Sequence, residues 1–361
     1  MGELLGLGLS HFGGFMFADE DMSARAKARL ANGSLPPELD SPDKWPVAMQ
    51  TEWGNDQGAS FAATHRDQYF EGLKHLRDSL DRFQPDAVII FGDDQYECFK
   101  EDLVPAYCVF VGDTFKTKPY LRARGLSGNT PNIWDDPFDL VVTNDGAPDV
   151  AKFLLNALLE EGFDPAYSYS LPHQKYLGHA FANTLLFLDH ERKGWPFPII
   201  PFAINAYGSA LIRAKGGLVE ADAPPEADRQ PDPPGPTPRR CFELGRAIGR
   251  VLRESPWRVA LVASASFSHG FLTKKNHDLF PDTPSDQARF AELQSGNYMA
   301  WRDLPLSTLE DAGQHELVNW CPMIGAMEEV GQKPTYCEFL QSYLMNSNKC
   351  VAVIPPASLT L

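Results

Sequence analysis

Three segments of the chain place polar side chains directly after an apolar run. In chain order, residues 4–9 lead into Ser10-His11, residues 87–91 lead into Gly92-Asp93-Asp94-Gln95, and residues 259–265 lead into Ser266-Phe267-Ser268-His269. In α/β proteins, ligands bind at the edge of the sheet formed by the carboxyl ends of the strands. We therefore expect the three polar clusters to share one site.

Donor groups from such distant segments suit a mononuclear metal centre better than a local zinc motif. A facial set of two histidines and one carboxylate binds Fe(II) and leaves positions open for a substrate and O₂. His11, His269 and the acidic or amide residues after residue 91 supply donors of this kind. Each histidine also has a structural alternative, because His11 can be a satisfied core residue and His269 can cap the segment that follows it.

Several common catalytic motifs are absent from the sequence. No GxGxxG opens a helix after a strand, and there is no P-loop, no HExxH and no GxSxG. Nicotinamide, ATP and serine-hydrolase chemistry therefore lose their usual sequence support.

Apolar strands alternate with amphipathic helices along the chain. Residues 61–83 have helical periodicity, Pro85 ends that helix, and a β-branched apolar strand follows. This pattern predicts an α/β fold with a central, mostly parallel sheet and helices on both faces, in a single large domain over residues 1–361. The strands expected in this sheet are residues 3–9, 86–91, 107–111, 140–143, 166–170 and 259–265.

Three other segments have distinct expectations. Residues 15–58 read as an irregular stretch that forms either a lid or wall of the site or a surface excursion. Residues 197–204 form a strand interrupted by prolines, which we expect at the periphery of the sheet or at a bulge. Residues 221–238 are rich in proline and predict a surface loop or linker.

Composition limits the partners of the protein. The formal net charge of −16 argues against nucleic acid and against an anionic membrane surface. The six cysteines are scattered without a CxxC pair, so they predict buried thiols in a reducing compartment. No apolar run reaches the length of a membrane span, and no signal peptide is evident. We expect a cytoplasmic protein that forms a homo-oligomer.

The polar strand ends resemble a known family, the class III extradiol ring-cleavage dioxygenases of the protocatechuate 4,5-dioxygenase catalytic-subunit type. The resemblance covers roughly residues 1–330 and treats the chain as one catalytic domain of that type. The segments that carry it are Leu9-Ser10-His11, residues 85–95, Thr114-Phe115-Lys116, Gly178-His179-Ala180 and Ser266-Phe267-Ser268-His269.

The resemblance implies Fe(II) as the cofactor, with a small catechol-like aromatic compound and O₂ as the substrates. It assigns His11 to the metal, His179 to acid/base catalysis and His269 to assistance by hydrogen bonding. Gln95 stands where the family has its second histidine ligand, so its carbonyl oxygen or the neighbouring Asp94 becomes the expected donor.

The family's glutamate ligand and one pocket histidine lack obvious counterparts. The glutamate is expected about a dozen residues after His269, where Pro284 stands between Asp282 and Asp286. His277 in the same segment is the preferred third ligand, and Asp282 and Asp286 are its alternatives. The pocket histidine falls roughly at Ala147.

The activity that follows is an iron-dependent, extradiol-type opening of an aromatic ring. Two alternatives depend on the altered ligand positions. One is a metal-free, non-catalytic homologue or subunit that keeps the pocket. The other is a metal-dependent lyase or hydrolase on the same scaffold.

Overall fold

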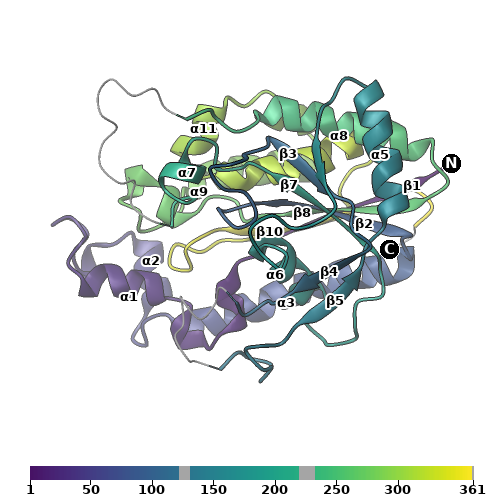
Figure 1. Cartoon of the computed structure of the whole chain (residues 1–361). Helices are drawn as coiled ribbons and strands as arrows, with labels where there is room; N and C mark the ends of the chain where they lie inside the picture. Colours follow the sequence, from purple (N-terminus) through teal and green to yellow (C-terminus); the bar gives the residue numbers. More distant parts are fainter. Residues whose placement is uncertain (122–130, 219–231, 360–361) are drawn as a thin grey trace.

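The computed structural model describes residues 1–121, 131–218 and 232–359, which form a twisted sheet between two layers of helices (Figure 1). Within these residues the main sheet has eight strands in the order β6-β3-β7-β2-β8-β1-β10-β9. Their bounds are β1 (Glu3–Leu9), β2 (Ala87–Asp93), β3 (Tyr107–Phe110), β6 (Ala166–Ser168), β7 (Ile199–Ile204), β8 (Arg258–Ser264), β9 (Tyr336–Leu340) and β10 (Lys349–Ile354).

The centre of the sheet is parallel and its margins contain antiparallel pairs. Strands β1 and β2 both pair in parallel with β8, and β2 also pairs in parallel with β7. Strands β10 and β9 add an antiparallel edge beside β1, and β3 lies antiparallel to β7. This arrangement confirms the predicted α/β class with a mostly parallel sheet.

Helices cover both faces of the sheet. The helices are α1 (Ala24–Ala31), α2 (Val47–Trp53), α3 (Ala59–Phe83), α5 (Pro148–Glu160), α6 (His179–Leu188), α7 (Ala210–Arg213), α8 (Pro238–Arg253), α9 (Thr283–Ser295), α10 (Tyr298–Arg302), α11 (Leu306–Asp311) and α12 (Trp320–Glu329). On one face of the sheet, α5, α8 and α12 pack against the strands and form one apolar core. On the other face, α3 and α6 pack against the strands and form a second core. The buried strands alternate their side chains between these two cores, as strands covered on both faces must.

Two predictions about strands were wrong. Residues 140–143 do not join the main sheet; instead β5 (Val142–Asp145) pairs with β4 (Thr114–Thr117) in a separate small sheet. The proline-containing strand β7 is internal rather than peripheral. Pro201 is tolerated there because the pairing of β7 with β3 involves residues 202–204 of β7 and stops before Pro201. No β3 carbonyl therefore needs an N–H from Pro201.

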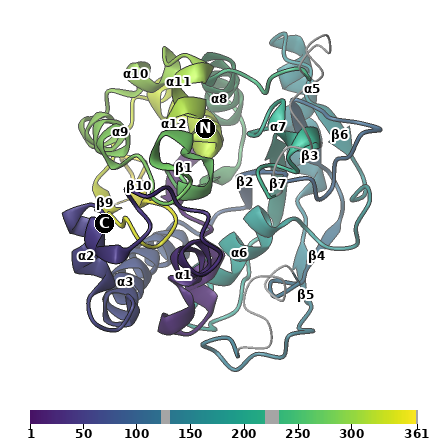
Figure 2. The ribbon, with the colours of Figure 1, turned by 90° about the vertical axis from the view of Figure 1, so that its left-hand side faces the viewer.

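The segment that precedes α3 extends beyond the sheet rather than covering one of its faces. In Figure 1, β1 runs from the N-terminus toward the side of the molecule where α1 and α2 lie. Figure 2 looks at the molecule from that side and shows α1 in front, between the labels of α3 and α6. The carboxyl ends of the central strands therefore face α1.

The predicted proline-rich segment at 221–238 lies partly outside the described residues. Residues 232–237 have no regular structure, and Pro238 is the first residue of α8. In the described part of the chain, no helix combines the length and apolar character that crossing a membrane requires.

Candidate active site

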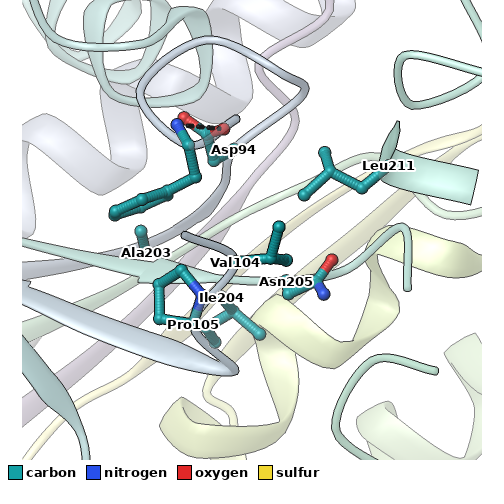
Figure 3. Close-up of a pocket in the computed structure, with 8 residues that line it drawn as sticks. Asp94, Val104, Pro105, Ala203, Ile204, Asn205 and Leu211 are labelled. Carbon is teal, nitrogen blue, oxygen red and sulfur yellow. Dashed lines mark hydrogen bonds between the residues drawn. The ribbon is translucent and has the colours of Figure 1, made fainter. Parts of the chain in front are cut away.

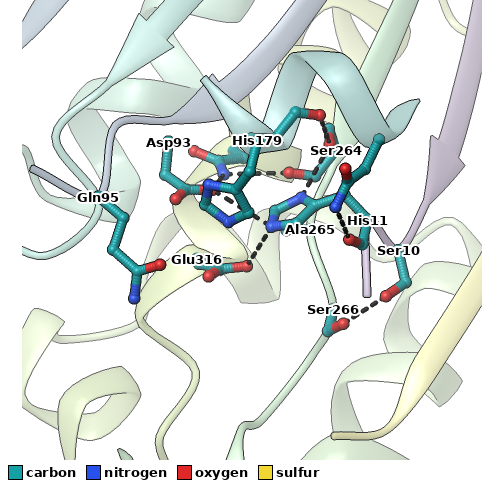
Figure 4. Close-up of polar contacts among 12 residues, drawn as sticks. Ser10, His11, Asp93, Gln95, His179, Ser264, Ala265, Ser266 and Glu316 are labelled. Atoms are coloured by element: carbon teal, nitrogen blue, oxygen red, sulfur yellow. Dashed lines mark hydrogen bonds and ion pairs between the residues drawn. The ribbon is translucent and has the colours of Figure 1, made fainter. Parts of the chain in front are cut away.

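Strands β2, β8 and β1 are neighbours in the sheet and run in the same direction, so their polar ends meet at one edge. His11 follows β1, Asp93 ends β2, and His269 follows β8 after a short connection. Two further elements contribute side chains at this edge (Figure 4). Helix α6 begins with His179, and the 3₁₀ helix His315–Asn319 contains Glu316.

The His11 imidazole lies at the centre of the site. Its Nδ1 atom is 2.9 Å from the Ser264 hydroxyl, which fixes the orientation of the ring. Its Nε2 atom is 3.5 Å from Glu316 Oε2 and 3.7 Å from Asp93 Oδ1. Burial lowers the pKa of His11 to about 3, so the ring is neutral near pH 7. A neutral imidazole is the form that binds a metal ion.

Glu316 is the carboxylate that our sequence analysis missed. It is buried, its Oε1 atom accepts a hydrogen bond from the Tyr207 hydroxyl, and its Oε2 atom is 3.5 Å from His269 Nε2. Burial opposes its charge, but the neighbouring His269 and His11 imidazoles and the Tyr207 hydroxyl lower the pKa of Glu316 overall. Because Oε2 accepts no hydrogen bond from the described residues, it is available to a cation.

His179 is oriented by a carboxylate. Its Nδ1 atom lies 2.8 Å from Glu97 Oε2, and its backbone N–H donates to Glu97 Oε1 at 3.0 Å. The ring meets the His11 ring edge-on, with 4.9 Å between the two centroids. Because Nδ1 faces Glu97, Nε2 is the ring nitrogen that faces the site.

The acidic and amide residues after β2 have different surroundings. Asp94 accepts three backbone N–H groups of its own loop, including Cys98 N at 2.6 Å, so the hydrogen bonds of its carboxylate are directed to that loop. The cavity beside it, in Figure 3, has a volume of only about 10 Å³, enough for about one water molecule. The Gln95 amide donates to Gly216 O at 2.7 Å, and Figure 4 shows its oxygen on the side of Glu316.

The preferred third ligand, His277, lies away from this site. Its side chain is exposed and its nearest carboxylate is Glu38, at 4.0 Å. The two alternatives also have other roles: Asp282 caps α9 by accepting from Ser285, and Asp286 is bonded by Ser268, Gln314 and Asn348. Glu316 therefore replaces all three in the set that surrounds His11.

The structure brings the other predicted residues together. A cavity of about 580 Å³ is lined by His11, Gln95, His179, His269 and Glu316. This volume is in the range of small-molecule sites in proteins. Ala147, the expected position of the family's other pocket histidine, lies beside the first turn of α5 and does not line the cavity.

The donor atoms around His11 fit a divalent cation. The ligand atoms offered by His11, Asp93 and His179 all lie within 4.8 Å of one another. Neighbouring donors of an octahedral ion with bonds of about 2.1 Å are about 3 Å apart. His11 Nε2 lies 3.7 Å from Asp93 Oδ1 and 3.5 Å from Glu316 Oε2, so each of these two pairs is close to that spacing, although Glu316 is not a member of the triad.

Two signals in the sequence point to the residues that we missed. Asp93 belongs to the cluster that follows residue 91, but its neighbours Asp94 and Gln95 were preferred as donors. Glu316 stands in a largely apolar segment that packs against the sheet, where an acidic side chain is costly unless it has partners. Glu316 was not considered as a ligand because it lies much farther along the chain from His269 than the expected dozen residues.

Part of the chain matches a family of known activity. Residues 232–348 match the family described as the catalytic LigB subunit of aromatic ring-opening dioxygenase, and this segment contains both His269 and Glu316. The match confirms the resemblance that the sequence motifs indicated.

The chain is also similar to curated proteins named 2,3-dihydroxyphenylpropionate/2,3-dihydroxicinnamic acid 1,2-dioxygenase. It is 27% identical to the Photorhabdus laumondii protein over 200 residues, which covers 55% of this chain and 47% of that protein. It is 25% identical to an Escherichia coli protein (strain 55989) over 238 residues, which covers 66% and 57% of the two chains. The chain thus spans about half the length of the curated relatives it matches.

A solved structure also aligns with the chain. It is the crystal structure of an uncharacterized protein from Escherichia coli K12, with a TM-score of 0.43 and 12% identity, and the alignment covers 79% of this chain and 92% of that one.

Proposed function

We propose that this protein is an iron-dependent extradiol-type dioxygenase that opens the ring of a catechol-like compound with O₂. The observation that carries the proposal is the position of His11 Nε2, between two carboxylates, in a cavity also lined by His179 and His269. The relatives are named for dioxygenase activity on dihydroxylated aromatic acids, which supports the same chemistry.

His11 and Glu316 are the residues that would hold Fe(II) through Nε2 and Oε2, with an oxygen of Asp93 or Gln95 as the third donor. A buried neutral imidazole and a carboxylate with one free oxygen are suitable donors for this ion. Fe(II), when bound, would acidify the hydroxyl groups of a catechol and let electron density pass from the catechol to O₂.

His179 is suited to move the substrate's proton. When Nδ1–H donates to the Glu97 carboxylate, the lone pair is on Nε2, and this atom can accept a proton from a hydroxyl group. The imidazolium that forms is stabilised by the same carboxylate, and because Nδ1–H remains bonded to Glu97, the proton that the ring later gives back leaves from Nε2. Glu97 therefore holds the ring in the tautomer that the reaction needs.

His269 is suited to orient the substrate or O₂ by hydrogen bonding. It is buried, and burial lowers its pKa, so the ring is neutral near pH 7 and can both donate and accept. Its Nε2 atom faces Glu316, and its Nδ1 atom is buried without a hydrogen-bond partner among the residues that the structure describes. The ring therefore has hydrogen-bonding capacity at Nδ1 that the described residues do not use.

The test is oxygen uptake by protein purified without air and loaded with Fe(II). We expect about one iron atom per chain, uptake of O₂ with a catechol, and a coloured ring-opened product. Absence of O₂ uptake with every catechol in a panel, in iron-loaded protein, would contradict the proposal. Turnover that continues without O₂ would instead favour a lyase or hydrolase, and failure to bind any metal would favour a non-catalytic homologue.

A further inference from the structure

The cavity extends from the histidines to two arginines on α1. Five residues of α1 and its C-cap line the cavity, and they form two adjacent rows at spacings of three or four positions on one side of the helix: Ala24, Arg25, Ala28, Arg29 and Asn32. Arg25 and Arg29 are one turn apart on this face, so their guanidinium groups are neighbours at the end of the cavity away from the main sheet.

In the described part of the chain, these two cations have backbone carbonyls rather than carboxylates as hydrogen-bond partners. Arg25 donates through Nη2 to the Asp278 carbonyl at 3.0 Å, and Arg29 donates through Nη2 to the His277 carbonyl at 2.7 Å. Neither forms an ion pair within the described part of the chain, and the Nε atom of each is buried without an acceptor. A guanidinium has five N–H donors, so most of this capacity remains available.

The charges around the two arginines leave this end of the cavity positive. Asp21 also lines the cavity, and Asp278 is paired with Lys274 at 2.9 Å. Burial and the neighbouring Arg29 lower the pKa of Arg25 to about 10, against the opposing effect of the Asp278 carboxylate, so Arg25 stays protonated near pH 7. The chain as a whole is strongly acidic, with a net charge of −16, so two adjacent cations facing one cavity contrast with its overall charge.

One aromatic ring separates the arginines from the histidines. The Phe271 ring lies 5.4 Å from the His269 ring and 5.7 Å from the Arg25 guanidinium carbon. Phe12, Met16 and Met22 supply further apolar wall. A substrate whose ring lies at the histidine end therefore needs only a short side chain to reach Arg25.

We propose that Arg25 and Arg29 bind a carboxylate on a short side chain of the substrate, so that the protein selects anionic catechols over neutral ones. Arginine forms paired hydrogen bonds with carboxylates, which makes it suited to this recognition. The position of the aromatic ring rests on the proposed function, but the anion site itself does not.

The test compares 2,3-dihydroxyphenylpropionate with its neutral methyl ester on the iron-loaded wild-type protein and on Arg25→Gln, Arg29→Gln and Lys27→Gln variants. Lys27 is the matched control, because it lies on the same helix, donates to Glu20 O and does not line the cavity. We expect KM for the acid to rise roughly 10- to 100-fold in each arginine variant, the range for a lost charge-assisted hydrogen bond. KM for the ester, and kcat for both compounds, should change by less than about threefold.

A second measurement does not depend on turnover. Binding of 3-phenylpropionate, which has no hydroxyl groups, is measured by calorimetry on protein without metal. We expect Arg25→Gln and Arg29→Gln to weaken this binding and Lys27→Gln to leave it unchanged.

Equal losses with acid and ester would overturn the inference, because they would show that the arginines only hold the 277–278 backbone. A wild-type protein with no preference for the acid would also overturn it, even if the glutamine variants fail to fold. If no catechol is turned over while 3-phenylpropionate still binds through the arginines, the proposed function fails and the anion site stands.

Discussion

His11 Nε2 and Glu316 Oε2 lie 3.5 Å apart, although one follows the first strand and the other belongs to a 3₁₀ helix near the C-terminal end of the chain. If both bind iron, His11→Ala and Glu316→Ala should each lose iron together with activity, because removing a ligand weakens metal binding directly. Iron per chain, measured after loading and desalting, checks this. Retention of a full iron atom by either variant would remove that residue from the ligand set.

His179 should behave differently from His11. His179→Ala should keep its iron and still bind substrate, while turnover falls by roughly 10²- to 10⁴-fold, the usual contribution of a positioned proton-transfer group. Metal content, melting temperature and turnover are measured together. A variant that is stable, iron-loaded and fully active would exclude His179 from the mechanism.

Glu97→Gln tests the orientation of His179 with a smaller change. The amide keeps the shape of the side chain but loses the charge that faces Nδ1 at 2.8 Å. We expect a fall in kcat of roughly 10- to 100-fold, typical of a group that orients a functional histidine, and a shifted pH profile. Unchanged kcat with an unchanged pH profile would show that Glu97 only caps α6.

The third ligand is decided by comparing Asp93→Asn with Gln95→Ala. Asp93 Oδ1 is 3.7 Å from His11 Nε2, whereas Gln95 is tied to Gly216 through its amide nitrogen. If Asp93 binds iron, Asp93→Asn should weaken iron affinity roughly 10-fold or more and Gln95→Ala should have little effect. The opposite order, measured by competition with a chelator, assigns the position to Gln95.

Sequence reasoning located the edge of the site but not all of its members. Each of β1, β2 and β8 is a continuous apolar run that ends in polar residues, so the meeting of His11 and His269 followed from strand direction alone. Glu316 depends on how α12 and the turn before it pack against the sheet. No local sequence pattern encodes that contact, so the sequence analysis placed the third ligand in the segment shortly after His269 instead of at Glu316.

The same limit explains the errors in the fold. Whether a short strand such as β5 joins the main sheet depends on which neighbour offers free N–H and C=O groups, and β4 offers them to it. The arginines of α1 also show this limit, because residues 15–58 permitted either a wall of the site or a surface excursion. Their contact with the cavity follows from the path of α1 in space.

The packing that brings β1 and Glu316 together is tested at Gly8. A Cβ at this position would lie 2.0 Å from the Trp320 ring, which is buried and bonded to Ala265 O. Gly8→Ala should lower the free energy of unfolding by about 1–3 kcal/mol and weaken iron binding, because Trp320 closely follows Glu316. Gly6→Ala is the control, since its Cβ meets the flexible Met327 side chain. Equal effects of the two changes in urea unfolding would contradict this account.

The buried carboxyl of Asp286 should give the protein a stability that depends on pH. Burial raises the pKa of Asp286 to about 7, so between about pH 4 and 7 the folded protein holds a proton that the unfolded chain has released. Stability is therefore lost as pH rises through this window, by up to about 1.4 kcal/mol per pH unit from this group.

The measurement is the free energy of unfolding in urea at about pH 5 and about pH 7. Asp286→Asn should make the protein less stable at the lower pH, because an amide cannot satisfy all of the Ser268, Gln314 and Asn348 donors, and should remove this part of the slope. Asp145→Asn, which changes an exposed carboxylate, should leave the slope as it is in the wild type. A slope that is the same in wild type and Asp286→Asn would mean that Asp286 is ionised throughout this range.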